Sequence, residues 1–184
     1  NEDFNLSAQV KIFNQQDQVF LDFESYIDQI EVAKISQNIP ESLADSRAVQ
    51  WIETVLTEGS LRDIMLTTRF NMSGEIESPN TKFSANLNGA TISADPKWPS
   101  IENINAKVNF SNDYLKIVGN QASVEDIDLS YLSITTRDFS QPDSTLSLNA
   151  RFNSESLIIE DFIKKSSVSE KIKAYLEEFE LKGK

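Results

Sequence analysis

The stretch Ile104-Asn-Ala-Lys-Val-Asn-Phe110 alternates strictly between apolar and polar side chains. A repeat of two residues places the apolar side chains on one face of a β-strand and the polar side chains on the other. The same alternation recurs in Phe83–Leu87 and in Leu146–Phe152. Each of these segments is therefore predicted to be a strand with one dry face and one wet face.

Further segments along the chain repeat this pattern and are separated by short polar stretches. They are Leu6–Ile12, Val19–Phe23, Ile64–Phe70, Tyr114–Val118, Ile127–Leu129 and Leu132–Ile134. The polar stretch Asn14–Asp17 has the length of a hairpin turn. Strands joined by short turns pair antiparallel, because parallel pairing needs crossovers of about a dozen residues or more. The predicted fold is mainly β, with one curved antiparallel meander sheet.

The alternation slips at Tyr131, between Ile127–Leu129 and Leu132–Ile134. A β-bulge or a kink at this point would change the face on which the following side chains lie. We therefore predict an irregularity of the strand at Tyr131.

Two regions lose the two-residue repeat and have helical spacing instead. In the first, Val49, Ile52 and Val55 fall on one helical face and Gly59 follows as a stop signal, which predicts a helix over residues 46–58. In the second, apolar spacing predicts helices near residues 155–165 and 168–180, the latter beginning at the capping-box sequence Ser167-Val-Ser-Glu170. These short amphipathic helices are expected to cap the sheet, because anionic lipid would repel their acidic polar faces.

Composition excludes several classes of enzyme and binding site. The chain has 184 residues, with 17 Lys and Arg against 29 Asp and Glu, a net charge of −12, and neither His nor Cys. It therefore cannot form a Ser-His-Asp or Cys-His nucleophile system, a zinc site of thiolates or imidazoles, or a disulfide framework. The carboxylates Glu125, Asp126 and Asp128 lack the spacing of a calcium loop and are predicted to be solvated. We expect no catalytic residues, no metal site, no cofactor and no nucleic-acid partner.

A sheet with one apolar face must cover that face with its own curl, with helices or with a ligand. One interpretation is a β-sandwich-like binding or adhesion module with a closed core. The other is an apolar groove that holds a ligand. Both interpretations need the same alternation, so the pattern leaves both open.

Several motifs carry a resemblance to a known family. They are Trp51-Ile-Glu-Thr-Val-Leu-Thr-Glu-Gly59, Leu61-Arg-Asp-Ile64, Phe83-x-Ala85-x-Leu87-x-Gly-Ala90, Trp98-Pro99-x-Ile101-x-Asn103 and Ala106-Lys-Val-Asn-Phe-Ser-Asn-Asp-Tyr-Leu115. With these motifs, which cover roughly residues 40–135, the chain resembles the AsmA-like, YhdP-type proteins of Gram-negative envelopes.

The resemblance implies a large periplasmic protein that is tethered to the inner membrane and serves outer-membrane biogenesis. Proteins of this type are built of repeated antiparallel sheet units that form a long hydrophobic groove for phospholipid transport between the two membranes. On that expectation, residues 1–184 are a single β-rich segment excised from such a protein. Its expected partners are phospholipid, neighbouring repeats of the same chain and the inner membrane, reached through an anchor outside this segment.

Together, the alternation and the resemblance nominate one set of lipid-facing residues, all on the apolar faces of predicted strands. They are Phe83, Ala85, Leu87, Ile104, Ala106, Val108, Phe110, Leu146, Leu148 and Ala150.

Overall fold

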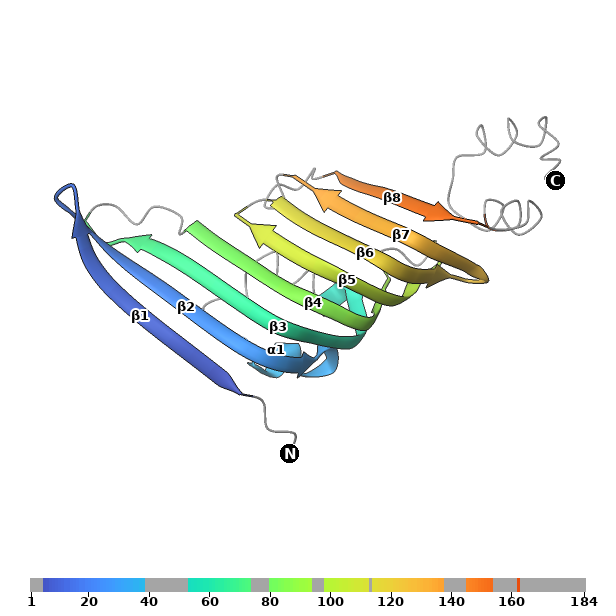
Figure 1. The fold of residues 1–184 in the computed structure, drawn as a ribbon, viewed down its shortest axis with the longest axis horizontal. Coiled ribbons are helices and arrows are strands. Elements are labelled where there is room, and N and C mark those ends of the chain that lie inside the picture. Colours follow the sequence, from blue (N-terminus) through green and yellow to red (C-terminus); the bar gives the residue numbers. More distant parts are fainter. Residues whose placement is uncertain are drawn as a thin grey trace.

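The described part of the chain forms one open antiparallel sheet of eight strands in the order β1-β2-β3-β4-β5-β6-β7-β8 (Figure 1). The computed structural model describes residues 5–38, 53–73, 80–93, 98–112, 114–137, 145–153 and 162. Every strand pairs with its neighbours in sequence, as the short turns require. The predicted meander is confirmed, and the described strands form a single layer in place of the two packed sheets of a sandwich.

The strands contain all the segments that the alternation predicted. Their bounds are β1 Leu6–Gln15, β2 Gln18–Glu31, β3 Leu56–Asn71, β4 Asn80–Ile92, β5 Ile101–Ser111, β6 Tyr114–Val124, β7 Ile127–Thr136 and β8 Leu146–Phe152. A short 3-10 helix η1, Val32–Lys34, and one helical turn α1, Ile35–Asn38, follow β2.

The predicted hairpin at Asn14–Asp17 is confirmed. Gln15 lies opposite Gln18 at the end of the β1–β2 ladder, so Gln16 and Asp17 form the turn. Both turn residues have positive φ, at 52° and 61°. Two left-handed residues form a turn whose twist matches that of the flanking strands, and polar side chains tolerate this conformation better than branched ones.

The predicted helix over residues 46–58 is wrong at its C-terminal end. Residues 53–55 are helical, but β3 already begins at Leu56, which lies opposite Ile92 and is buried. Gly59 is therefore a strand residue and does not end a helix. The apolar pair Val55 and Leu56 fits either structure, and pairing with β4 decides in favour of the strand. Residues 39–52, most of 155–165 and all of 168–180 lie outside the described residues, apart from Phe162, which is helical.

The alternation slips in each strand from β2 to β7, and β3 has a further irregularity between Leu56 and Ser60. At each slip, two residues of the apolar side of the sheet flank two largely polar ones. The slips are Ile27-Asp-Gln-Ile30, Leu61-Arg-Asp-Ile64, Leu87-Asn-Gly-Ala90, Ile101-Glu-Asn-Ile104, Gly119-Asn-Gln-Ala122 and Leu129-Ser-Tyr-Leu132. The irregularity predicted at Tyr131 is the last of these, and it is confirmed by a register shift between Leu129 and Tyr131 in the pairing with β8.

The slips of β2 and β3 lie side by side, as do those of β6 and β7, whereas the slips of β3 and β4 meet only at Leu61–Leu87. Together the slips form a staggered line across the sheet that we call the crease. Ile30 is opposite Leu61, Ala90 is opposite Ile104 and Gly119 is opposite Leu132. Figure 1 shows the strands curving strongly toward the end at which η1 and α1 lie. Apolar residues from both sides of the crease belong to one buried cluster. The strands therefore bend toward the apolar side of the sheet, and the bend helps to cover it.

Gly59 permits a close approach of β3 to β4 at the crease. Its φ is +95°, and a Cβ at this position would lie 2.6 Å from the Cα of Ala90 and 2.7 Å from the carbonyl oxygen of Gly89. Both the backbone conformation and the space therefore exclude a side chain.

We expect Gly59→Ala to destabilise the protein more than Gly89→Ala. Gly89 also has a positive φ, +58°, but a Cβ there would meet nothing within 4 Å. The free energy of unfolding of the control should therefore fall only by the cost of placing a side chain on a left-handed residue, about 1–2 kcal/mol. Gly59→Ala adds a backbone clash to that cost. Urea unfolding of the two variants measures the difference. Equal losses would show that the approach at Gly59 does not constrain the fold.

Candidate functional site

The predicted lipid-facing residues of β4 and β5 lie opposite one another on one face of the sheet. Phe83 is opposite Phe110, Ala85 is opposite Val108 and Leu87 is opposite Ala106. Ile104 joins the same face at the crease, opposite Ala90. Directly opposed residues of an antiparallel pair share a face, so the register brings these candidates together.

The candidates on β8 belong to the same face, although two strands separate them from β5. Leu148 is opposite Ile134, Ile134 is opposite Ile117 and Ile117 is opposite Val108. Leu146 and Ala150 lie opposite Thr136 and Leu132 in the same ladder. The sheet therefore joins all the predicted residues through β6 and β7.

The sequence-based set missed the residues that extend this face in both directions. The rows continue from Phe83 to Leu66 on β3, and from Ile64 to Ile27 on β2 and Leu6 on β1. Other omitted members include Val10, Ile12, Leu21, Phe23, Leu115, Ile117, Leu132, Ile134 and Phe152. They show the same alternation, which was the available signal. We call the complete surface, which spans all eight strands, the apolar face.

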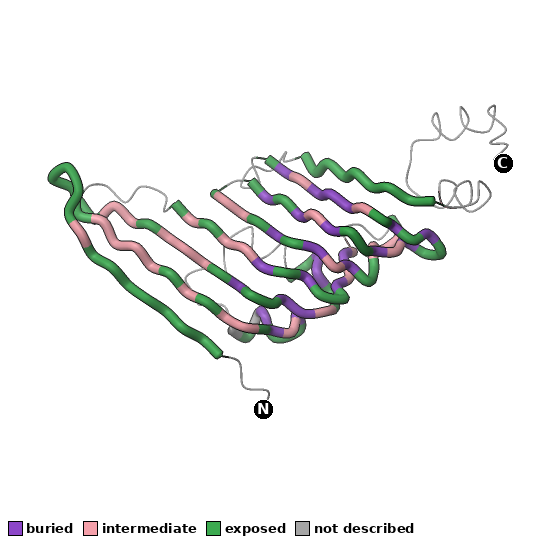
Figure 2. The backbone as a smooth tube through the Cα atoms, in the orientation of Figure 1, coloured by how far each residue is buried: buried purple, intermediate pink, exposed green. Residues whose placement is uncertain are grey.

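The apolar face is buried in the middle of the sheet and exposed at its two edges (Figure 2). Ile104 and Leu132 are 0% exposed and Val108 is 7% exposed. By contrast, Leu148 on β8 is 49% exposed and Ile12 on β1 is 67% exposed. The candidates consequently divide into Ala85, Leu87, Ile104, Ala106 and Val108 in the core, Phe83 and Phe110 at intermediate exposure, and Leu146, Leu148 and Ala150 in the open.

Some of the residues that cover the middle of the apolar face belong to short helical segments. Val32 of η1, Ile35 of α1 and Val55 before β3 are members of the buried cluster, and Phe162 packs against it. The bend at the crease and these side chains both shield the face from water, and such burial stabilises by about 25 cal/mol per Å² of apolar area.

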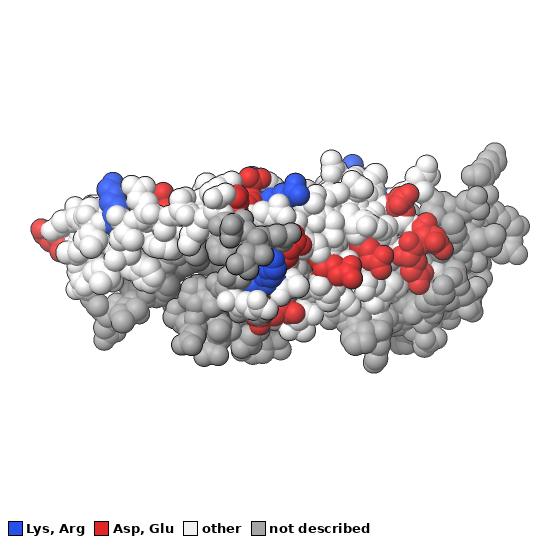
Figure 3. Space-filling model, turned by 90° about the horizontal axis from the view of Figure 1, so that it is seen from below, with Lys and Arg blue, Asp and Glu red and all other residues white. Residues whose placement is uncertain are grey.

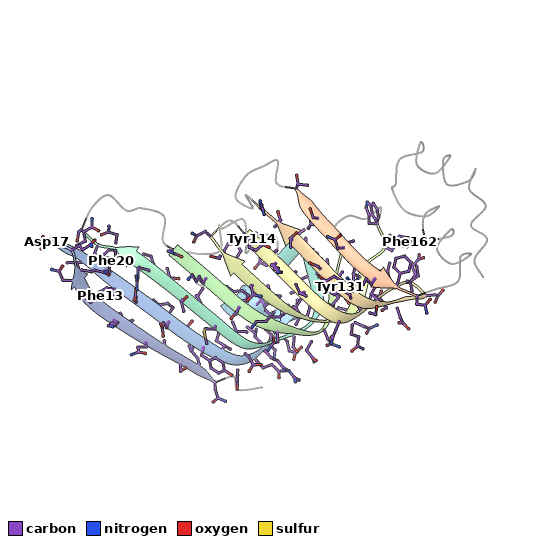
Figure 4. The ribbon with its side chains drawn as sticks, turned by 45° about the horizontal axis from the view of Figure 1, so that its top comes forward. Phe13, Asp17, Phe20, Tyr114, Tyr131 and Phe162 are labelled. Carbon is purple, nitrogen blue, oxygen red and sulfur yellow. The ribbon has the colours of Figure 1, made fainter. Side chains whose placement is uncertain are left out.

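The opposite, polar face carries an aromatic and charged cluster near the β1–β2 hairpin (Figure 4). The rings of Phe13 and Phe20 are stacked with centroids 5.7 Å apart. The guanidinium of Arg69 on β3 lies 5.3 Å from the first ring and 5.9 Å from the second, and the Lys11 ammonium lies 5.4 Å from the Phe13 ring. Arg69 also donates two hydrogen bonds to Asp22, with Nε–Oδ1 at 2.6 Å and Nη2–Oδ2 at 2.8 Å. These contacts join β1, β2 and β3 on the polar face, which lies opposite the buried apolar cluster.

Hydrogen bonds and charges near β1 lower the pKa of two carboxyl groups. The bidentate hydrogen bond from Arg69 holds the pKa of Asp22 below its ordinary value, and the nearby Lys11 charge acts in the same direction. The pKa of Asp28 is lowered by hydrogen bonds from Asn5, whose side-chain amide donates at 2.8 Å and whose backbone N–H donates at 3.0 Å. Both interactions stabilise the charged carboxylate.

The other edge is held by a comparable contact on the polar face. The Arg151 guanidinium of β8 lies 5.3 Å from the ring centroid of Tyr131 on β7. Each edge strand is thus fixed by a cation–π contact on its polar face, while its apolar side chains remain exposed on the other face.

The acidic side chains do not converge on a metal site in the described part of the chain. No group of His, Cys, Asp or Glu there has the size and arrangement to hold a metal ion. Glu125, Asp126 and Asp128 are exposed, and acidic side chains gather in a band over the surface seen from below (Figure 3). In the same described residues, no helix has both the length and the apolar character needed to cross a membrane.

The family model described as YhdP protein matches residues 1–184. No curated protein and no solved structure matches the chain.

We expect Asp22→Asn to make stability less dependent on acidic pH. A carboxyl group whose pKa is lowered by folding stabilises the fold above its ordinary value of 3.8, and this stabilisation is lost as the pH falls through the lowered value. The variant should therefore be less stable than wild type at pH 7 and should lose less stability on acidification. Urea midpoints measured from about pH 6 to about pH 2 test this, since the stabilisation by the Asp22 carboxylate is lost at pH values below the ordinary pKa of the group. Glu24→Gln, on the same face of β2, is the control, and an Asp22→Asn profile parallel to that of wild type would contradict the prediction.

Proposed function

We propose, from the premise that this chain belongs to the YhdP protein family, that its apolar face lines part of a path for phospholipid acyl chains. The observation that carries this proposal is the continuity of the apolar face across all eight strands, from exposed residues on β1 to exposed residues on β8. A ligand lying along this face would cross the strands, and every strand would contribute apolar contacts.

The energetics of acyl chains suit such a surface. Burial of each methylene is worth about 0.8 kcal/mol, so a lipid tail gains stability in small and equal steps along an apolar row. The polar and charged groups of the described strands lie mainly on the opposite face or at the strand ends. Retention should accordingly depend on acyl length more than on the lipid headgroup.

The proposal places the protein in the periplasm, tethered to the inner membrane through an anchor outside this segment and serving transport to the outer membrane. Neighbouring repeats of the same chain would continue the sheet at its edges. The exposed apolar side chains Leu6, Val10 and Ile12 on β1 support this role, as do Leu146, Leu148 and Phe152 on β8. An edge strand also offers unpaired N–H and C=O groups to a further strand.

The proposed role is transport without catalysis. Transfer along an apolar surface requires no nucleophile and no proton transfer, and the chain has neither His nor Cys for the nucleophile systems that depend on them. We propose that no cofactor takes part.

The burial of the middle of the sheet favours a second candidate function, a binding module with a closed core. In that case Val108 and its neighbours would stabilise the fold and would never contact lipid. The exposed residues of β8 and the buried residues of β5 therefore give different tests of the proposal.

We expect a photo-crosslinking amino acid at Leu148 or Val108 of the full-length protein to capture phospholipid in cells. Leu148 is 49% exposed and tests the edge, whereas Val108 is 7% exposed and tests whether the middle of the face opens. Asn149 and Asn109, the polar neighbours on the other face, are the controls and should be labelled several-fold less. Mass spectrometry of the captured lipid measures the outcome.

Equal labelling at apolar and polar positions, or none at either, would overturn the lipid proposal. Labelling at Leu148 without labelling at Val108 would restrict the path to the sheet edge and support a closed core in the middle.

We also expect the isolated chain to self-associate through its edges, more strongly at high salt. Unpaired edge strands seek partners, while the net charge of −12 opposes contact between copies until salt screens it. Sedimentation at tens of micromolar, from low to high ionic strength, measures this association. A monomer at every salt concentration would mean that the edges are protected and need no neighbouring repeat.

A further inference from the structure

The crease is built from a sequence pattern that recurs in successive strands. From β2 to β7, each slip has two apolar or small residues on the apolar face and two mainly polar residues between them. The third residue of the pattern is left-handed in three adjacent strands, with φ of 51° at Asp63, 58° at Gly89 and 52° at Asn103. A left-handed residue in a strand redirects the chain and increases its local bend. The bend is therefore a repeated feature of the backbone.

Polar side chains connect neighbouring strands along this line. Asp63 accepts hydrogen bonds from the Tyr26 hydroxyl at 3.2 Å and from the Asn86 amide at 2.9 Å, so it joins β2, β3 and β4. The Asn103 amide of β5 donates to the Ser123 hydroxyl of β6 at 3.0 Å. These bonds serve polar groups at places where the regular ladder is interrupted.

Asn105 makes the central connection. Its side-chain oxygen accepts a hydrogen bond from the backbone N–H of Gly89 at 3.1 Å, and its side-chain nitrogen donates to the Gln121 amide oxygen at 2.9 Å. Asn105 directly follows the slip of β5, and its side chain thereby links this strand to the crease positions Gly89 of β4 and Gln121 of β6. The β5–β6 register shifts between Glu102 and Asn105 and again between Asn105 and Ala106, so the ladder is irregular on both sides of this residue.

The backbone near Asn105 leaves little room for another arrangement. A Cβ at Gly119 of β6 would lie 2.6 Å from the Asn105 carbonyl oxygen and 2.9 Å from the Cβ of Ala106. The strands therefore approach closely on one side of Asn105, and its amide bridges them on the other.

We infer that Asn105 is a positioning residue that holds the crease. It thereby sets how far the two parts of the bent sheet, one on each side of the crease, close over the apolar face. Its relevance to acyl chains rests on the proposed function, because the bend decides how much of the face a lipid tail reaches. The residue acts on the sheet and need not touch the lipid.

The first test measures the bend without any lipid. The chain has no Cys, so Lys82→Cys and Asp126→Cys introduce two unique sites for spin labels. Lys82 lies near the start of β4, before the slip of that strand, and Asp126 lies in the β6–β7 turn on the other side of the crease. Both residues are exposed. Pulsed electron resonance measures the distance distribution between the labels.

Asn105→Ala should lengthen and broaden this distribution, because it removes both hydrogen bonds. Asn105→Asp should restore the wild-type distribution, since one carboxylate oxygen accepts from Gly89 and the other accepts from the Gln121 amide after that amide rotates. Asn109→Ala, on the same face of β5 but away from the crease, is the matched control. A wild-type distribution for Asn105→Ala would overturn the inference.

A second variant keeps the test decisive if Asn105→Ala fails to fold. Gln121→Ala removes only one of the two hydrogen bonds and should give a smaller shift in the same direction. An unchanged distribution in Gln121→Ala, together with loss of folding in Asn105→Ala, would show that Asn105 is needed for folding and does not set the bend, which would also overturn the inference.

The second measurement links the bend to acyl chains. In the full-length protein with a crosslinker at Leu148, Asn105→Ala should change the distribution of captured acyl lengths, whereas Asn105→Asp should not. Absence of captured lipid in the wild type would count against the proposed function and leave the distance result valid. A changed distance with an unchanged acyl distribution would confine Asn105 to shaping the sheet and overturn the inference that the bend decides how much of the apolar face a lipid tail reaches.

Discussion

The removal of one continuous apolar face from water is the constraint on which the rest of this structure depends. Each strand contributes alternating apolar side chains, and antiparallel pairing joins them into rows that cross the sheet. A flat single layer would leave those rows exposed, at a cost proportional to their area. The strands instead bend, and residues as distant in sequence as Val32 and Leu132 share one buried cluster. The curl of the sheet is therefore part of its core.

Bending a sheet interrupts its hydrogen-bond ladder, so the bend requires polar compensation. Asp63, Asn103 and Asn105 supply it through bonds to neighbouring strands. In the described residues, no buried side-chain nitrogen or oxygen lacks a partner. The edges present the opposite case, because among the described strands β1 and β8 each pair with a neighbour on one side only. There, Arg69 and Arg151 hold the edge strands through their π contacts, while the apolar side chains stay exposed. The same apolar surface is consequently a core in the middle and an open surface at the edges.

The candidate surface could be predicted in part. Alternation was sufficient to place Leu87, Val108 and Leu148 on one type of face, because the repeat of a strand is independent of its neighbours. It could not show that Leu148 is exposed while Val108 is buried, since that difference depends on whether a further strand or helix lies nearby. The helix ending at residue 58 failed for a related reason: Leu56 pairs with Ile92, and this partner is remote in sequence. The slips in β2 to β6 were not predicted from the sequence. Two adjacent polar residues between apolar ones, as in Leu61-Arg-Asp-Ile64 and Leu87-Asn-Gly-Ala90, indicate them.

The sequence by itself determined the strands, the hairpin at Gln16 and Asp17, the meander order and the slip at Tyr131. All of these follow from local periodicity, turn chemistry and short connections. Only the tertiary structure decided that the separate slips form one crease, that Gly59 lies against Ala90, and that one Asn amide bridges β4, β5 and β6. The physical reason is that these features depend on register between strands. Register is set jointly by all the paired faces, and no single segment contains that information.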